Sequence, residues 1–264
     1  MKRRIRNLLS ELFLDAFDDP GGRAAIARLM RFCEIAARRN PPEVFWADLR
    51  PEGLTIRSGR KSKTDEAFAR LVGPDKLLRF RSVLTGETLT AMPPPQAETL
   101  TWIVQVQPEV RTDFPEVCER VRIYAEIVTQ MGETGAISAQ REPLRKALAE
   151  AAMCFNVGLF FEAHEHLEHH WAALPKGPMK RYLQGIIQIS VGFHHARSGN
   201  YHGTVSQLAK GLAKTLGPTG ETLGLDCDTF LPEVAAAREE IVRRGPAAMR
   251  PVPLAAIPRM PIRG

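Results

Sequence analysis

The sequence lacks any long hydrophobic run. Nowhere in its 264 residues is there an uninterrupted apolar stretch of the roughly 18 residues that a membrane-spanning helix needs. The first segment, MKRRIRNLLSELFLDAF, is basic and then amphipathic, without the continuous apolar core and small-residue cleavage site of a secretory signal. We therefore expect no membrane span and a cytoplasmic location.

Cysteine is scarce, and the cysteines are far apart. The four are Cys33, Cys118, Cys154 and Cys227, and no CxxC pair occurs. A zinc site built from thiolates normally has closely spaced pairs, so this pattern argues against one. We interpret all four as reduced thiols, most of them buried.

Acidic residues are too few to balance the basic ones. The formal net charge is +6, and the basic residues are densest in KRRIR at 2–6 and RSGRKSK at 57–63. Such runs are usually solvated, and they are not gathered on one recognisable face. The excess charge permits association with nucleic acid without establishing it.

The composition is otherwise that of a globular protein, with 44% hydrophobic and 25% charged residues. No internal repeat is present. Residues 1–135 read as helices around a mixed stretch with a few short strands, 136–245 as a helical bundle, and 246–264 as a proline-rich tail, extended or disordered. The fold class predicted is mainly α, with a C-terminal antiparallel helical bundle after a smaller mixed α+β or helical N-terminal region.

Local signals place the individual elements. Hydrophobic periodicity, caps and breakers predict helices at 19–40, 64–73 and 113–132, strands at 53–59 and 100–108, and a stiff loop at 91–99. In the C-terminal part they predict helices at 141–155, 159–174, 179–197, 201–217 and 230–244. The connections between these helices are short, so consecutive helices should be antiparallel neighbours.

Histidine is absent from the first 163 residues, and all seven histidines lie between positions 164 and 202. At about 100° per residue, Glu168 lies about 40° from His164, within the arc of aromatic and apolar residues of the helix at 159–174. Glu165 lies at the edge of this arc. The spacing therefore selects His164 from the four histidines of this helix.

Exposure is expected for the other five histidines that point elsewhere: His166, His169, His170, His194 and His202. Glu162 is likewise expected to point toward solvent or another partner.

The helix at 179–197 carries a polar stripe. Gln184, Gln188, Val191 and His195 fall within about 60° of one another. The short turn at 175–178 places Gln184 level with Glu168, and Gln188 level with His164. His195 is then roughly 10 Å along the axis from His164, too far for both to ligate one ion.

Two interpretations of this polar cluster remain open. In the structural one, His164, Glu168 and the two glutamines form an internal hydrogen-bond network that fixes the helix pair. In the functional one, His164, Glu165 and Glu168 bind a divalent metal ion, held by His164 and Glu168, or move a proton. The HExxE sequence is not the HExxH metalloprotease motif, because Glu168 stands where that motif has its second histidine. Phe160, Phe161 and Trp171 are expected in the core or along the adjoining groove.

Two segments together resemble a known family. FNVGLFFEAHEHLEHHW and YLQGIIQISVGFHHARSGNYHGT are similar to the bacterial and archaeal domain-of-unknown-function family 309 (DUF309), whose pattern runs N-x-G-x-(aromatic)-x-E-A-H-E-x-L-E-x-x-W. The resemblance extends over about residues 140–245. It implies a compact all-helical domain and no particular reaction. Thr204 departs from the alanine usual in the family.

Three function hypotheses follow. The first is a binding or assembly module that uses the His/Glu/Gln cluster and the groove aromatics to hold a small ligand, a protein partner or a second copy of the chain. The second is a metal-dependent hydrolase centred on His164, Glu165 and Glu168. The third is a nucleic-acid-associated regulator.

Overall fold

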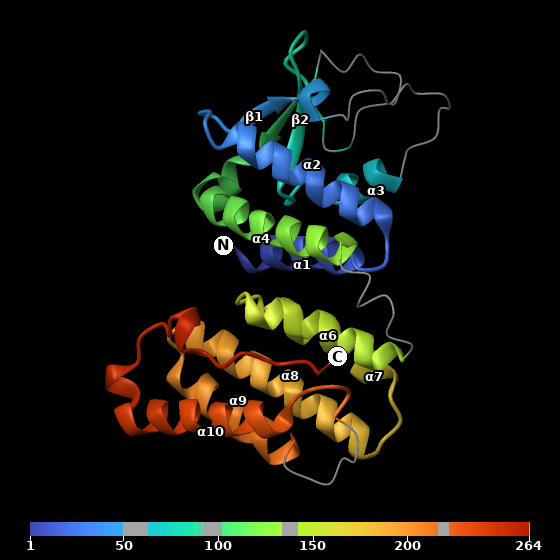
Figure 1. Ribbon diagram of the computed structural model, residues 1–264. Coiled ribbons are helices and arrows are strands. Elements are labelled where there is room, and N and C mark those ends of the chain that lie inside the picture. Colours follow the sequence, from blue (N-terminus) through green and yellow to red (C-terminus); the bar gives the residue numbers. More distant parts are fainter. Residues whose placement is uncertain (50–62, 90, 92–101, 134–141, 216–221, 264) are drawn as a thin grey trace. The chain divides into compact units, whose positions relative to one another are not determined.

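The computed structural model describes residues 1–49, 63–89, 91, 102–133, 142–215 and 222–263. Contacts within the chain divide it into two compact units, Met1–Glu133 and Thr134–Gly264 (Figure 1). The strand predicted at 53–59 and most of the loop predicted at 91–99 lie outside the described residues. No helix in the described part of the chain is both long and apolar enough to cross a membrane.

The described part of the first unit contains four α-helices, which are α1 (Arg3–Asp15), α2 (Pro20–Ala36), α3 (Lys63–Ala69) and α4 (Phe114–Glu133). Asp19 caps α2 by accepting hydrogen bonds from the backbone N–H groups of Gly21 and Gly22. The apolar faces of α1, α2 and α4 meet in a core where the rings of Phe13 and Tyr124 stack at a centroid distance of 4.1 Å. Short 3-10 helices lie at Trp46–Leu49 and Pro108–Asp113.

A four-stranded antiparallel sheet completes this unit, with the order β1-β4-β2-β3. Its strands are β1 (Glu43–Phe45), β2 (Leu78–Ser82), β3 (Thr88–Leu89) and β4 (Trp102–Val106). Val44, Val104 and Phe80 lie side by side across the sheet and are fully buried. The strand predicted at 100–108 is confirmed as β4, whereas β1, β2 and β3 were not predicted.

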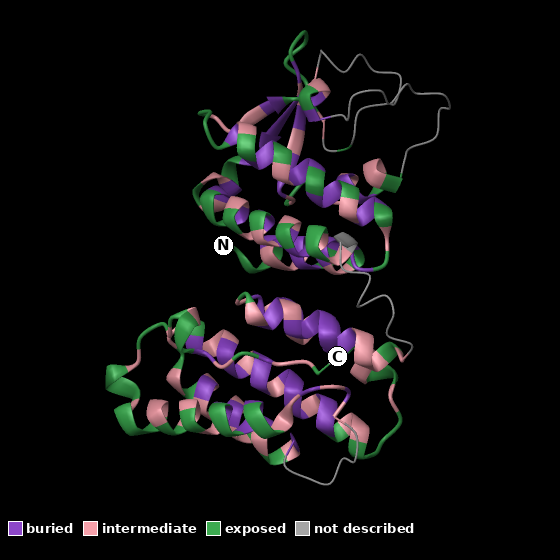
Figure 2. Cartoon of the chain, viewed as in Figure 1, coloured by how far each residue is buried: buried purple, intermediate pink, exposed green. Residues whose placement is uncertain are grey.

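The second unit is a helical bundle, as predicted. Its helices are α6 (Pro143–Asn156), α7 (Phe160–Ala173), α8 (Pro178–Arg197), α9 (Tyr201–Thr215) and α10 (Cys227–Arg244). Glu142 caps α6, and Pro143 and Pro178 occupy first turns, where a missing N–H costs nothing. Buried residues run along α8, which packs against both α7 and α9 (Figure 2).

The contact between α8 and α9 depends on glycine. A Cβ on Gly192 would lie 2.5 Å from Leu208 Cδ2, and one on Gly211 would lie 2.8 Å from the carbonyl oxygen of Gly185. Hydrogen in place of a side chain therefore lets the two helix backbones approach closely. Gly185 and Gly211 therefore lie where the two helices approach each other most closely.

The proline-rich tail is extended and packs on the bundle. The Asn156 side chain accepts from the N–H of Met260 (2.7 Å) and donates to its carbonyl (3.0 Å), and Ile262 forms a β-bridge with Leu225. Short 3-10 helices lie at Pro246–Ala248 and Leu254–Ala256. Met260 is only 1% exposed, so the tail contributes to the core of this unit.

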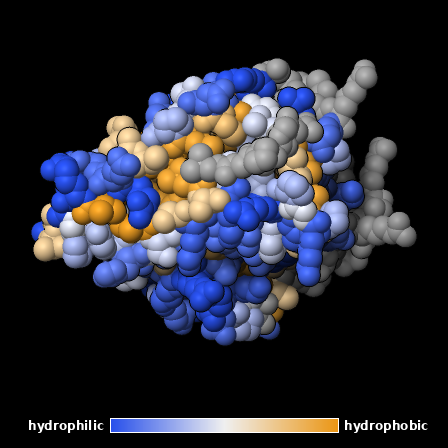
Figure 3. All heavy atoms as spheres, turned by 90° about the horizontal axis from the view of Figure 1, so that it is seen from below, coloured by the Kyte–Doolittle hydropathy of each residue, from blue (hydrophilic) through white to orange (hydrophobic). Residues whose placement is uncertain are grey.

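The described surface is largely polar. Viewed from below, hydrophilic side chains surround a hydrophobic patch (Figure 3). Large hydrophobic side chains that are more than a third exposed are, among the described residues, Phe45, Val83, Leu84, Val157 and Val242. Cys33 and Cys154 are buried, Cys118 and Cys227 are half-buried, and none of the four forms a disulfide.

Candidate functional site

Helix α7 forms the frame of the candidate site. The turn before it contains Gly158 with φ +86°, a conformation that glycine adopts without strain, and this turn reverses the chain from α6 into α7. α7 then packs between α6 on one side and α8 on the other. Trp171 Nε1 donates to the carbonyl of Lys180 (3.0 Å), which fixes the α7–α8 hairpin close to the predicted register.

His164 lies between two carboxylates of its own helix. Its Nδ1 is 3.3 Å from Glu165 Oε1, and its Nε2 is 3.0 Å from Glu168 Oε2. The exposed fractions of the three side chains are 20%, 43% and 52% for His164, Glu165 and Glu168. Within the described residues, their ligand atoms form a group in which all lie within 4.8 Å of one another.

This arrangement calls for a positive charge, either a second proton on the ring or a bound cation, for a simple chemical reason. A neutral imidazole has one N–H and one lone pair, so it can donate to only one of two carboxylates. Its other nitrogen then directs a lone pair at a carboxylate oxygen, and that contact is repulsive unless a second proton or a metal ion lies between them. Two ligands that are each about 2.1 Å from one ion lie about 3–3.5 Å apart, similar to the distance between His164 Nε2 and Glu168.

The polar stripe of α8 lies at the surface, because α7 and α9 cover the two sides of α8 and leave this stripe between them. Gln184, Gln188, Val191 and His195 are all half-buried. Gln188 Oε1 accepts from Lys214 Nζ of α9 (2.9 Å). Gln188 therefore pairs with Lys214 and not with the predicted His164 or Glu168. His164 and Glu168 do contact each other, and about half of Glu168 is exposed.

His195 belongs to the α8–α9 turn. Its Nδ1 is 3.2 Å from Nδ2 of Asn200, whose Oδ1 accepts from the N–H of Gly203 (3.0 Å). If the amide nitrogen donates, as this network assigns it, Nε2 of His195 carries the proton. Asn200 thus caps α9, and His195 takes no part in the His164 group.

The three aromatic candidates have different surroundings. Phe160 is 1% exposed and contacts Phe155 and Phe193, so it belongs to the core and lines no surface groove. Phe161 is half-buried between the rings of His164 (5.8 Å) and His194 (6.0 Å). Trp171 stacks under Lys180 Nζ at 4.6 Å, at the other end of α7.

Residues 148–207 match the family model of a domain of unknown function, DUF309. No curated protein and no solved structure gives a significant match to the chain. The DUF309 match is shorter than the region suggested by the motifs and covers most of α6, all of α7 and α8, and the first part of α9. All of the site residues predicted from the sequence lie within the matched segment, which includes no residue of the first unit.

The DUF309 segment also contains a second polar group that sequence reasoning missed. His166 Nε2 lies 2.9 Å from Glu150 Oε2 of α6, and these residues are 8% and 2% exposed. Glu162 is fully buried. The prediction that His166 is exposed is wrong, because α7 buries a second face against α6. Of the two alternatives for Glu162, solvent or another partner, its burial excludes solvent.

Burial also changes the chemistry of Cys154 on α6. Desolvation first, then the nearby carboxylates of Glu162 and Glu150, raise the pKa of this thiol well above its ordinary value. Cys154 is therefore an inert thiol at neutral pH. The signal that sequence reasoning could have used is the spacing of Glu162 and His166, one turn apart on the face of α7 away from His164.

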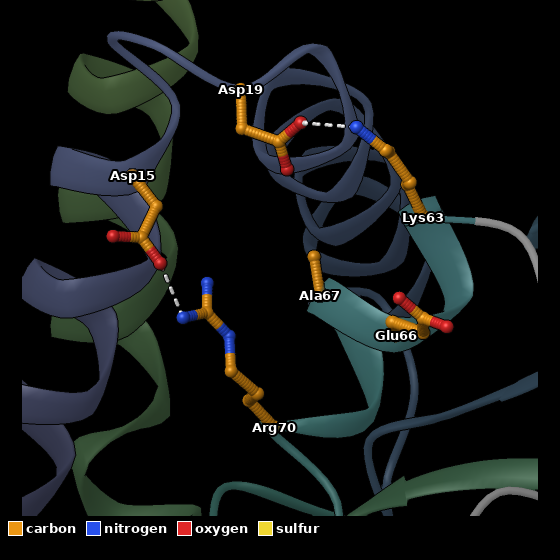
Figure 4. A pocket seen from close by; sticks show the side chains of 6 residues that line it. All are labelled: Asp15, Asp19, Lys63, Glu66, Ala67 and Arg70. Atoms are coloured by element: carbon orange, nitrogen blue, oxygen red, sulfur yellow. Dashed lines mark hydrogen bonds and ion pairs between the residues drawn. The ribbon is translucent and has the colours of Figure 1, made fainter.

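The first unit contains a polar cleft of about 290 Å³ between α1, α2 and α3 (Figure 4). Four of its charged side chains form two pairs: Arg70 binds Asp15, and Lys63 Nζ is 4.0 Å from the capping residue Asp19. Asp19 is also occupied in capping α2. The cleft offers a weaker case for a ligand than the His164 group.

Proposed function

We propose that the helical unit is a binding module whose site is the group of His164, Glu165 and Glu168, and that this site holds a divalent metal ion. The observation that carries the proposal is the pair of carboxylates on both ring nitrogens of one half-buried imidazole. Nε2 of His164 and a carboxylate oxygen of Glu168 would bind the ion. The Nδ1–H would donate to Glu165, the common arrangement in which a carboxylate orients a metal-bound histidine.

The chemistry of the ligands suggests a transition metal such as zinc. Imidazole nitrogen with carboxylate oxygen suits Zn²⁺, whereas Mg²⁺ and Ca²⁺ prefer oxygen alone. Two protein ligands leave further coordination positions to be filled by water, a small ligand, a protein partner or a second copy of the chain. The half-exposed position of Glu168 leaves those positions accessible from the surface.

Binding is favoured over hydrolysis. A metal-dependent hydrolase needs a general base within reach of the metal-bound water. Glu165, the carboxylate available for that role, lies beside Nδ1 and is engaged in orienting the ring. The hydrolase and nucleic-acid alternatives therefore have less support than a binding module.

Metal titration of the purified full chain tests the proposal. Calorimetry with Zn²⁺, together with elemental analysis after dialysis, should give one ion for each chain. His164→Ala and Glu168→Ala should each abolish this binding. His169→Ala is the matched control, since His169 is an exposed histidine of the same helix. Binding that is absent in the wild type, or unchanged in both site variants, would refute the proposal.

A further inference from the structure

The close contact of α8 and α9 brings three basic side chains to one region of the second unit. Arg181 Nη2 of α8 donates to the carbonyl of Ala213 (3.2 Å), and Lys214 of α9 donates to Gln188 Oε1 of α8 (2.9 Å). Lys210 lies one helical turn before Lys214, on the same face of α9. We call Arg181, Gln188, Lys210 and Lys214 the basic cluster.

Among the residues that the structure describes, the basic cluster has no acidic counterpart. Within the described part of the chain, no carboxylate forms an ion pair with Arg181, Lys210 or Lys214, although ion pairs are common elsewhere on the surface. The pKa of Lys214 is lowered from its ordinary value, first by desolvation and then by repulsion from Arg181 and Lys210. Arg181 binds the carbonyl of Ala213, the residue before Lys214, and Lys210 lies one turn earlier, so the three cations are neighbours and an anion among them would reduce their repulsion.

The attraction of a helix C-terminus for cations explains only part of this arrangement. Carbonyl groups in the last turn of α9 attract positive charge, and Arg181 binds one of them. Lys214 instead directs its ammonium group at an amide oxygen on the neighbouring helix. Lys210 is exposed and lies a full turn from the end of α9.

The hydrogen-bonding capacity of the cluster is almost entirely that of donors. Arginine and lysine only donate, and the oxygen of Gln188 is already occupied by Lys214, which leaves the amide NH₂ to donate. An anion with several oxygen atoms matches this set, because each oxygen accepts hydrogen bonds and carries part of the charge. We propose that the basic cluster is a binding site for a phosphate-class anion, presented by a small molecule.

The inference is independent of the proposed metal site, which lies on α7 and involves none of these residues. Calorimetric titration of metal-free full-length protein with inorganic pyrophosphate, in a phosphate-free buffer of low ionic strength, tests it directly. Wild type should bind one pyrophosphate, with an affinity that falls as salt is added. Lys214→Ala should weaken binding by about tenfold or more, since a charge-assisted hydrogen bond is lost.

Gln188→Glu is the sharper variant. It places a carboxylate beside Lys214 without changing the size of the side chain, so an internal ion pair should replace the external anion and binding should be lost while folding is kept. Arg250→Ala is the control, because Arg250 is an exposed residue of the tail whose bonds are to neighbouring carbonyls. It should bind as wild type does.

Three results would overturn the proposal. The first is the absence of pyrophosphate binding by wild type at low salt. The second is binding that survives both Lys214→Ala and Gln188→Glu. The third comes from a parallel titration with a single-stranded oligonucleotide. If the oligonucleotide binds, pyrophosphate does not, and both variants lose the oligonucleotide, then the cluster is a nucleic-acid contact.

Discussion

On α7, two histidines two residues apart each lie near a glutamate, one pair at the surface and one between helices. His164 and Glu168 are 3.0 Å apart, with side chains 20% and 52% exposed. His166 and Glu150 are 2.9 Å apart, with side chains 9% and 3% exposed. The distances are nearly equal, so the two pairs differ in burial. The inner pair, His166 and Glu150, is buried and must be satisfied by the protein, whereas the outer pair, His164 and Glu168, remains available to a ligand.

The largest effect is expected at the inner pair. His166→Ala leaves Glu150 buried with Lys146 as its nearest remaining cation, at 3.6 Å. The variant leaves a buried carboxylate oxygen without its hydrogen-bond partner and opens a cavity, which together should lower the free energy of unfolding by about 3 kcal/mol. Urea denaturation of the full chain measures this, with the exposed His169→Ala as control. If the free energy of unfolding falls by less than about 1 kcal/mol, the proposed contrast between the buried and the exposed face of α7 is wrong.

The next effect concerns α8, one side of which is closed by contact with α9, while its polar stripe is half-exposed. Gly192→Ala would place a methyl group 2.5 Å from Leu208 on the closed side, and overpacking of this kind costs about 1–3 kcal/mol. Gln184→Ala, on the half-exposed stripe, should cost less than about 0.5 kcal/mol. Thermal denaturation of the two variants compares them, and equal losses would show that the α8–α9 contact relaxes around the added methyl group.

These contrasts also explain what the sequence could reveal. Caps, prolines and glycines are local signals, so the helices of the second unit were predicted within a few residues of their observed ends. The turn at Gly158 determines which side of α7 faces α6. The hydrophobic periodicity of α7 carries no information about this turn, and His166 was therefore wrongly predicted to be exposed. Strand β2 was missed because its sequence, LRFRS, lacks the β-branched residues that identified β4, WIVQV, and it becomes a strand by pairing with β4.

For the candidate site, the sequence predicted which residues lie together better than it predicted what surrounds them. The angular argument selected His164 and Glu168 correctly as neighbours, since i and i+4 on a helix always share a face. It did not reveal that the glutamines of α8 face outward, because that requires the position of α9. Lys214 was consequently overlooked as the partner of Gln188.

The third prediction uses pH to probe the inner face of α7. Cys154 has a raised pKa when folded, so above its ordinary value of 9.0 the unfolded chain releases a proton that the folded chain keeps. Folded protein then binds more protons than unfolded protein, and stability falls as pH rises above 9. Cys154→Ala should flatten this fall by up to about 1.4 kcal/mol for each pH unit.

Urea denaturation at several pH values between neutral and alkaline measures the slope. Cys227→Ala is the comparison, because Cys227 is half-buried and its thiol pKa is raised less strongly, mainly by burial. It should change the slope by less than Cys154→Ala does. Identical slopes for wild type and Cys154→Ala would mean that this thiol ionises in the folded protein as it does in the unfolded chain.

The smallest effect on the metal-free protein is expected at the outer pair. His164→Ala removes a half-exposed ion pair, and such pairs contribute only about 0–1 kcal/mol. The difference should appear when Zn²⁺ is added, because a ligand at 100 times its dissociation constant stabilises the folded state by about 2.7 kcal/mol. Urea denaturation with and without Zn²⁺ should therefore show a gain for wild type and for His169→Ala, and none for His164→Ala. A gain in all three proteins would place the ion elsewhere, and the outer pair would then be, like the inner one, a contact that serves only the fold.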